Sequence, residues 1–157
     1  MSTNDGYDLS IRASSLSDLF DCSARWQAKH LLGKTMPSGA AATIGTAIHR
    51  GTAAFDTLRM LDIEPDVDEA VELSTEAVRE PGYEVQWDDM RPGEAIDIAA
   101  RLTLNYCLDI SPTFKFRRVE MKLNHLDVQA ENGVVIRFTG RLDREYQEGD
   151  RYGIADF

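Results

Sequence analysis

Residues 139–157 read TGRLDREYQEGDRYGIADF and have the pattern of two strands separated by a turn at QEGD, residues 147–150. Side chains in a β-strand alternate between two faces of the sheet. Asp156 therefore shares a face with Tyr152 and Ile154. The pattern predicts that residues 151–157 form a β-strand, with the carboxylate of Asp156 near the end of that strand.

The residues before this stretch also follow a strand pattern. After Pro112 the spacing of apolar residues changes from about 3.6, typical of a helix, to two, typical of a half-buried strand. KFRRVEMKL at 115–123 alternates in this way, and Asn132-Gly133 is a hairpin signal because both residues tolerate positive φ. We therefore expect a meander of three strands. Its middle strand places Ile136, Phe138, Gly140, Leu142 and Tyr146 on one face and Arg137, Thr139, Arg141 and Asp143 on the other.

Helical patterns occupy the chain before Pro112. Apolar spacing and capping signals predict helices over about 15–33, 43–61, 66–80 and 92–110, with a flexible loop at 34–43. Helices that precede a run of strands are typical of an α+β fold. We predict N-terminal helices packed on a mainly antiparallel or mixed sheet, and one domain that spans residues 1–157.

Composition excludes several classes of protein. The sequence has 17 basic and 27 acidic residues, and its net charge of −10 does not favour general attraction to nucleic acid or anionic membrane. No stretch approaches the roughly 18 apolar residues of a membrane span, and the first residues lack a secretory signal. The two cysteines, Cys22 and Cys107, are far apart in sequence and indicate reduced thiols in the cytoplasm.

Three polar residues stand where the patterns place core or core-adjacent groups: His49, Asp143 and Asp156. A single histidine near a helix seam is more often packed or solvated than a ligand, and a single strand aspartate usually faces solvent. Two carboxylates on adjacent strands with an imidazole nearby are a different matter. Magnesium prefers oxygen ligands, and manganese also accepts an imidazole nitrogen.

Five motifs occur in an order that resembles a known family. They are SSLSDLFDC at 14–22, GTAIH at 45–49, EMKL at 120–123, GRLDR at 140–144 and IADF at 154–157. Together they resemble the PD-(D/E)XK nuclease superfamily. The resemblance is to the branch with RecB-type nuclease domains, the AddB nuclease and CRISPR-associated RecB-like exonucleases, and it runs from Ser14 to Phe157.

The resemblance implies a fold and a reaction. The fold would contain a restriction-endonuclease-like core, and the reaction would be metal-dependent hydrolysis of DNA phosphodiesters, as in the exonucleases of DNA repair and recombination. It implies that His49, Asp143 and Asp156 bind magnesium or manganese and belong, with Glu120, to the catalytic set. For Glu120 an equally open alternative is a salt bridge with Arg118 or Arg137. Arg141 and Arg144 flank Asp143 and are candidates for phosphate contacts.

The resemblance also bears on the last residues and on Cys22. The family has a lysine two residues after its second acid, which would be residue 158 here, followed by a helix and a further strand. We therefore expect an incomplete domain with little or no nuclease activity, and an exposed sheet edge that pairs with another copy or a partner chain. Some members of this branch bind an iron–sulfur cluster through four cysteines, and with two cysteines we expect none here.

Two other functions remain open from the sequence. One is a non-catalytic module derived from the nuclease fold, whose negative charge suits protein contacts or mimicry of DNA. The other is an ordinary α+β binding domain with accidental motif matches.

Overall fold

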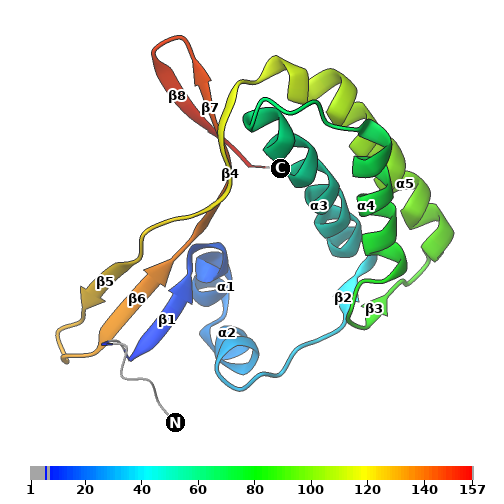
Figure 1. The fold of residues 1–157 in the computed structure, drawn as a ribbon. Helices are drawn as coiled ribbons and strands as arrows, with labels where there is room; N and C mark the ends of the chain where they lie inside the picture. The colour runs from blue at the N-terminus through cyan, green and yellow to red at the C-terminus, as the bar shows by residue number, and fades with distance from the viewer. Residues whose placement is uncertain (1–5, 7, 157) are drawn as a thin grey trace. The chain divides into compact units, whose positions relative to one another are not determined.

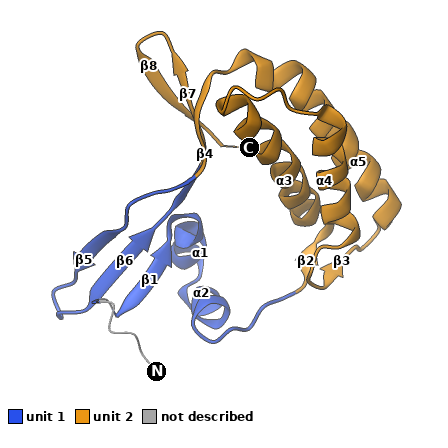
Figure 2. Cartoon of the chain, in the orientation of Figure 1, with its two compact units in different colours: residues 1–36, 121–142 blue, residues 37–120, 143–157 orange. Residues whose placement is uncertain are grey.

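A computed structural model of the chain describes residue 6 and residues 8–156. The chain forms two compact units, which Figure 2 distinguishes by colour: residues 1–36 with 121–142, and residues 37–120 with 143–157. Each unit is described by itself below, and the prediction of one domain over 1–157 stays a prediction. Phe157, the last residue of the IADF motif, lies outside the described residues.

The first unit contains a three-stranded mixed sheet. Strand β6 (Val135–Thr139) lies between β1 (Leu9–Arg12), to which it is parallel, and β5 (Leu126–Gln129), to which it is antiparallel. The Asn132-Gly133 turn therefore joins β5 to β6, and the prediction that it joins the strand at 115–123 to the return strand was wrong.

The first predicted helix is two helices in the structure. A short 3₁₀ turn at Ala13–Ser15 leads into α1 (Leu16–Asp21), and α2 (Ser23–His30) follows after Cys22, whose backbone is extended with φ −155° and ψ 95°. The break lets the buried Trp26 donate from its indole nitrogen to the Ser15 hydroxyl at 3.1 Å. In one straight helix these residues would be about 16 Å apart along the axis, so the hydrogen bond requires the break.

Three helices form the core of the second unit. Helices α3 (Ala40–Met60), α4 (Val67–Arg79) and α5 (Pro92–Asn105) lie side by side in Figure 1. The chain continues from α5 through a π-helical turn at Tyr106–Ile110 and a 3₁₀ turn at Ser111–Thr113. Their contact is built from small and branched side chains, which allow the helices to approach closely: Ile44, Ala47, Val78, Ala95 and Ala99.

Helix α3 begins before the predicted position. The loop expected at 34–43 contains β2 (Ser38–Gly39), which pairs in parallel with β3 (Val85–Gln86), and the helix starts directly after it. The backbone hydrogen bonds of this pairing order a segment whose side chains are too small to anchor it, and sequence periodicity does not detect such bonds.

The other three strands form a second three-stranded sheet, in the order β4 (Phe116–Lys122), β7 (Arg141–Glu148) and β8 (Arg151–Ala155). Strands β7 and β8 are antiparallel, as the turn at QEGD predicts. The long return strand of the predicted meander is divided at Gly140 into β6 and β7, which belong to different sheets. The Leu123 side chain packs on Gly140, where an added Cβ would lie 3.3 Å from Leu123 Cδ1. The absence of a side chain at residue 140 therefore leaves room for Leu123 at the point where the chain passes from β6 to β7.

The α+β class predicted from the sequence is confirmed, with helices and mixed sheets in one chain. Among the described residues, no helix combines the length and the apolar character needed to cross a lipid bilayer.

Candidate metal centre

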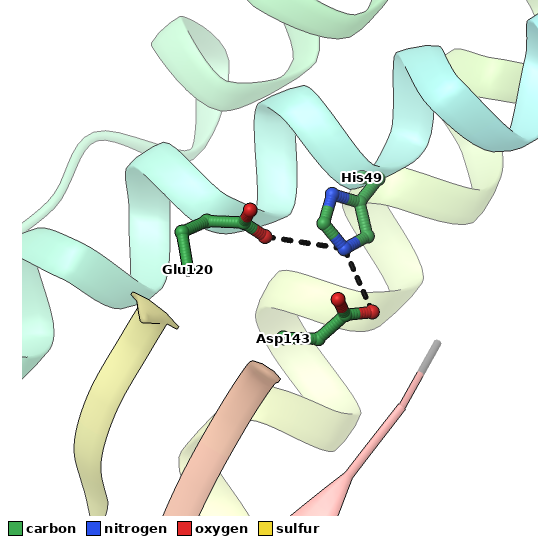
Figure 3. A group of neighbouring side chains, drawn as sticks. All are labelled: His49, Glu120 and Asp143. Atoms are coloured by element: carbon green, nitrogen blue, oxygen red, sulfur yellow. Dashed lines mark ion pairs between the residues drawn. The ribbon is translucent and has the colours of Figure 1, made fainter. Parts of the chain in front are cut away.

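Three side chains from three elements of the second unit meet at one point (Figure 3). The Nε2 atom of His49 on α3 lies 2.8 Å from an Asp143 carboxylate oxygen on β7 and 3.2 Å from a Glu120 oxygen on β4. One donor atom from each residue lies within 4.8 Å of the other two. The side chains are 18 to 27% exposed, so the cluster is sheltered but open to a ligand from solvent.

Local structure explains the direction of two of these side chains. His49 lies at mid-length in α3, three and seven residues before the buried Thr52 and Asp56, so the three share one face of the helix. Leu142 is buried beside Asp143 on β7, and strand alternation turns Asp143 to the opposite face. The sequence pattern predicted this placement of Asp143.

At Glu120, which reaches the cluster from β4, the backbone departs from strand geometry. The φ angle of Glu120 is +52°, a left-handed value that residues other than glycine and asparagine rarely adopt. The departure interrupts the predicted alternation of 115–123. The salt bridges considered for Glu120 are made by other residues: Arg118 pairs with Glu145 at 2.6 Å and Arg137 with Asp127 at 2.8 Å.

The strain at position 120 leads to a stability prediction. Glu120→Ala and Glu120→Gly both remove the carboxylate, but only glycine adopts positive φ at no steric cost. The left-handed conformation costs about 1–2 kcal/mol and the extra backbone freedom of glycine about 0.5–1 kcal/mol, so we expect the glycine variant to be the more stable by about 0.5–1 kcal/mol. Urea denaturation of the two variants measures the difference. The reverse order, usual for a strand, would mean that the backbone of Glu120 is relaxed.

Asp156, a predicted metal ligand, follows strand β8, is exposed and lies outside the group of His49, Glu120 and Asp143, but its carboxyl group interacts with that of Asp143. A hydrogen bond with the Asp143 carboxyl group raises the pKa of Asp156, and the negative charge of Asp143 adds to this effect. Each carboxylate therefore disfavours ionisation of the other, and a cation bound between them would offset this repulsion.

The donor set fits a hard divalent cation. Carboxylate oxygens are the ligands that magnesium prefers, and one imidazole nitrogen beside them is compatible with manganese. Cys22 is exposed and Cys107 is buried, and neither belongs to the cluster of His49, Glu120 and Asp143.

Comparison with protein families decides the identity of the fold. The family model of the PD-(D/E)XK nuclease superfamily matches residues 10–157, nearly the whole sequence. The chain belongs to the PD-(D/E)XK nuclease superfamily. Nucleases of this superfamily act on DNA and use divalent metals, in agreement with the donor set of the cluster. A search among curated proteins gives no match.

In this PD-(D/E)XK chain the two predicted phosphate contacts lie in different environments. Arg141 is exposed at the start of β7, and its contact with phosphate stays a prediction. The side chain of Arg144 is 0% exposed and pairs with Asp56, so its position does not support the predicted contact. By strand alternation Arg144 shares the buried face with Leu142, a signal in the sequence that predicts a buried arginine.

Sequence reasoning missed the residues beneath the centre. Asp56, Thr52, Tyr106 and Ser111 are buried and linked to Arg144 or to one another by hydrogen bonds. The spacing of seven residues between His49 and Asp56 places them on one helix face and is the signal that connects them in the sequence. Tyr106 and Ser111 follow no such spacing, since they come from the irregular turns after α5.

Proposed function

We propose that this chain is a metal-dependent deoxyribonuclease domain of the RecB-like exonuclease branch, with manganese or magnesium held by His49, Glu120, Asp143 and Asp156. The observation that carries the proposal is the convergence of His49, Glu120 and Asp143, whose donor atoms lie within 4.8 Å of one another. These residues come from three separate elements, so no local pattern accounts for their meeting.

The residues of the centre have distinct roles in this proposal. The bound cation supplies an activated water and stabilises the negative charge that develops on the phosphate. Asp143 contacts both His49 and Asp156 and forms the middle of the centre. His49 contributes a nitrogen donor, which favours manganese over magnesium. Asp156 adds a third carboxylate, beside that of Asp143.

The charge of the chain limits how DNA approaches. With a net charge of −10, general attraction to a polyanion is absent, so binding depends on local groups. The cation is one such group, and the exposed Arg141 is our candidate for a second, through a charge-assisted contact with a phosphate. We place the protein in the cytoplasm, where Cys22 and Cys107 stay reduced. Pairing through the sheet edge stays a prediction.

Manganese binding tests the proposal directly. Calorimetric titration of the chain with Mn²⁺ should show a site whose affinity falls by at least about 10²-fold in Asp143→Asn, since even the neighbours of metal ligands affect affinity by about 10–100-fold. Asp97→Asn is the matched control, because Asp97 is an exposed carboxylate on α5 and the charge change is the same. Equal Mn²⁺ affinity in wild type and Asp143→Asn would refute the metal centre.

The exonuclease assignment has its own test. An exonuclease requires a DNA end, so any Mn²⁺-dependent cleavage should degrade linear duplex and leave covalently closed circles intact. Loss of this cleavage in Asp143→Asn, and its retention in Asp97→Asn, would tie it to the centre. Cleavage of closed circles at the same rate would identify an endonuclease instead.

A further inference from the structure

A buried ion pair lies beneath the candidate metal centre. Arg144 and Asp56 are both 0% exposed, and the guanidinium Nε donates to an Asp56 oxygen at 2.6 Å. The same carboxylate accepts from the Tyr106 hydroxyl at 2.7 Å and from the Ser111 hydroxyl at 2.6 Å. Asp56 is therefore held on both oxygens and gives Arg144 a fixed anchor.

The other nitrogens of Arg144 reach the centre itself. One terminal nitrogen donates to the Asp143 backbone carbonyl at 3.0 Å and to a Glu120 carboxylate oxygen at 3.4 Å. The second donates to the Thr52 hydroxyl at 3.3 Å, and that hydroxyl donates to the backbone carbonyl of His49 at 3.3 Å. A single planar guanidinium thus connects the backbone or side chain of each residue in the cluster.

Glu120 is the residue that most needs such a connection. Its left-handed φ of +52° is unfavourable for glutamate, so the surrounding contacts must select this conformation. Its carboxylate contacts Arg144 at 3.4 Å and His49 at 3.2 Å. Both contacts hold the carboxylate at the centre. Without Arg144, one of the two contacts that offset the unfavourable φ of Glu120 is lost, so the backbone at residue 120 is freer to relax and move the carboxylate out of its position in the centre.

We propose that Arg144, anchored by Asp56, is a positioning residue that holds Glu120 and Asp143 in the geometry that binds the cation. This inference rests on the proposed function. Asp56 has a second effect, because its negative charge balances the guanidinium and prevents a buried positive charge from repelling the cation. An arginine suits this position because its planar guanidinium donates several hydrogen bonds in fixed directions, which the ammonium group of lysine cannot do.

A charge-neutral replacement separates positioning from overall charge. The double variant Asp56→Asn with Arg144→Met removes one negative and one positive charge. The asparagine oxygen still accepts a hydrogen bond from one of the two hydroxyls, Tyr106 or Ser111, and its amide NH2 group donates to the oxygen of the other. We expect its dissociation constant for Mn²⁺, measured by calorimetry on the folded protein, to rise by about tenfold. Arg144→Lys keeps the positive charge opposite Asp56 and loses the fork, and we expect a rise of similar size.

A matched control shows whether lower stability by itself weakens Mn²⁺ binding. Val78→Ala opens a cavity in the helix core, away from Asp56 and Arg144, and lowers the melting temperature. We expect its Mn²⁺ affinity to stay within about twofold of the wild type, because a folded centre does not depend on core packing elsewhere. Melting curves of all variants run beside the titrations.

The outcomes distinguish the two proposals. If wild type binds Mn²⁺ and Asp143→Asn does not, while the double variant and Arg144→Lys both bind as wild type does, the positioning role is refuted and the metal centre stands. If wild type itself shows no Mn²⁺ site, both fall together. Loss of affinity in Val78→Ala equal to that in the double variant would also refute positioning, because general destabilisation would explain both.

Discussion

Arg144→Met should lower the free energy of unfolding by about 3–5 kcal/mol, the cost of leaving one member of a buried ion pair without its partner. Methionine has a suitable volume for the site, so the loss comes from charge rather than from a cavity. Asp56 is 0% exposed, and in this variant its remaining partners are the hydroxyls of Tyr106 and Ser111. These neutral donors replace neither the positive charge of Arg144 nor its hydrogen bond of 2.6 Å. Urea denaturation followed by circular dichroism measures the change.

A double-mutant cycle identifies the cause of this loss. Asp56→Asn in the Arg144→Met background removes the unpaired charge, so the double variant should recover much of the stability and be more stable than Arg144→Met alone. If the two substitutions instead destabilise additively, the ion pair is not the reason for the effect.

Gly51→Ala should destabilise the protein by about 3 kcal/mol, at the upper end of the usual range for overpacking a core. A Cβ at Gly51 would overlap the backbone carbonyl oxygen of Ala70 on α4 and lie 3.1 Å from Ser74 Cβ and 3.3 Å from Thr103 Cγ2. A backbone carbonyl in a helix cannot rotate away as a side chain can. The helices must therefore separate, and α3 carries both His49 and Asp56.

Gly45→Ala is the matched control in the same helix. Gly45 is exposed, and an added Cβ meets no atom within 4 Å. Alanine favours the helix by about 0.8–1.0 kcal/mol over glycine, so this variant should be slightly more stable than the wild type. If Gly51→Ala were also stabilising, the close approach of α3 to α4 would be relaxed in solution.

The candidate site was predictable where local patterns carried it. His49 lies in a helix with clear apolar spacing, and Asp143 and Asp156 lie in or beside alternating strands, so both their elements and their faces followed from periods of 3.6 and 2. Glu120 was matched by its motif, but its left-handed backbone was not foreseen, because a strained conformation arises from contacts with distant residues. The prediction that Arg144 contacts phosphate did not take into account that Arg144 shares a strand face with Leu142, which is the buried face.

The fold shows the same division. The helices at 43–61, 66–80 and 92–110 and the first and last strands after Pro112 were predicted closely, because their residue spacing records which face is buried. Strand β5, whose four residues are all exposed, has no such spacing and was not predicted. The pairing of strands was predicted less well. The break at Gly140, which sends β6 and β7 into different sheets, depends on Leu123 packing on a glycine 17 residues away in the sequence.

The sequence by itself determined the α+β class, the succession of most helices and strands, and the residue types able to hold a divalent cation. These properties depend on local preferences and on the period of apolar residues, which a single chain displays directly. The tertiary structure alone decided that Glu120 joins His49 and Asp143, and that Asp56 and Arg144 pair beneath them, 88 residues apart in the chain. Asp56 and Arg144 are both fully buried, and a buried charge without its partner costs about 3–5 kcal/mol, so the two must pair once the fold buries them. Which segments are buried together depends on the packing of the whole chain, which no local pattern records.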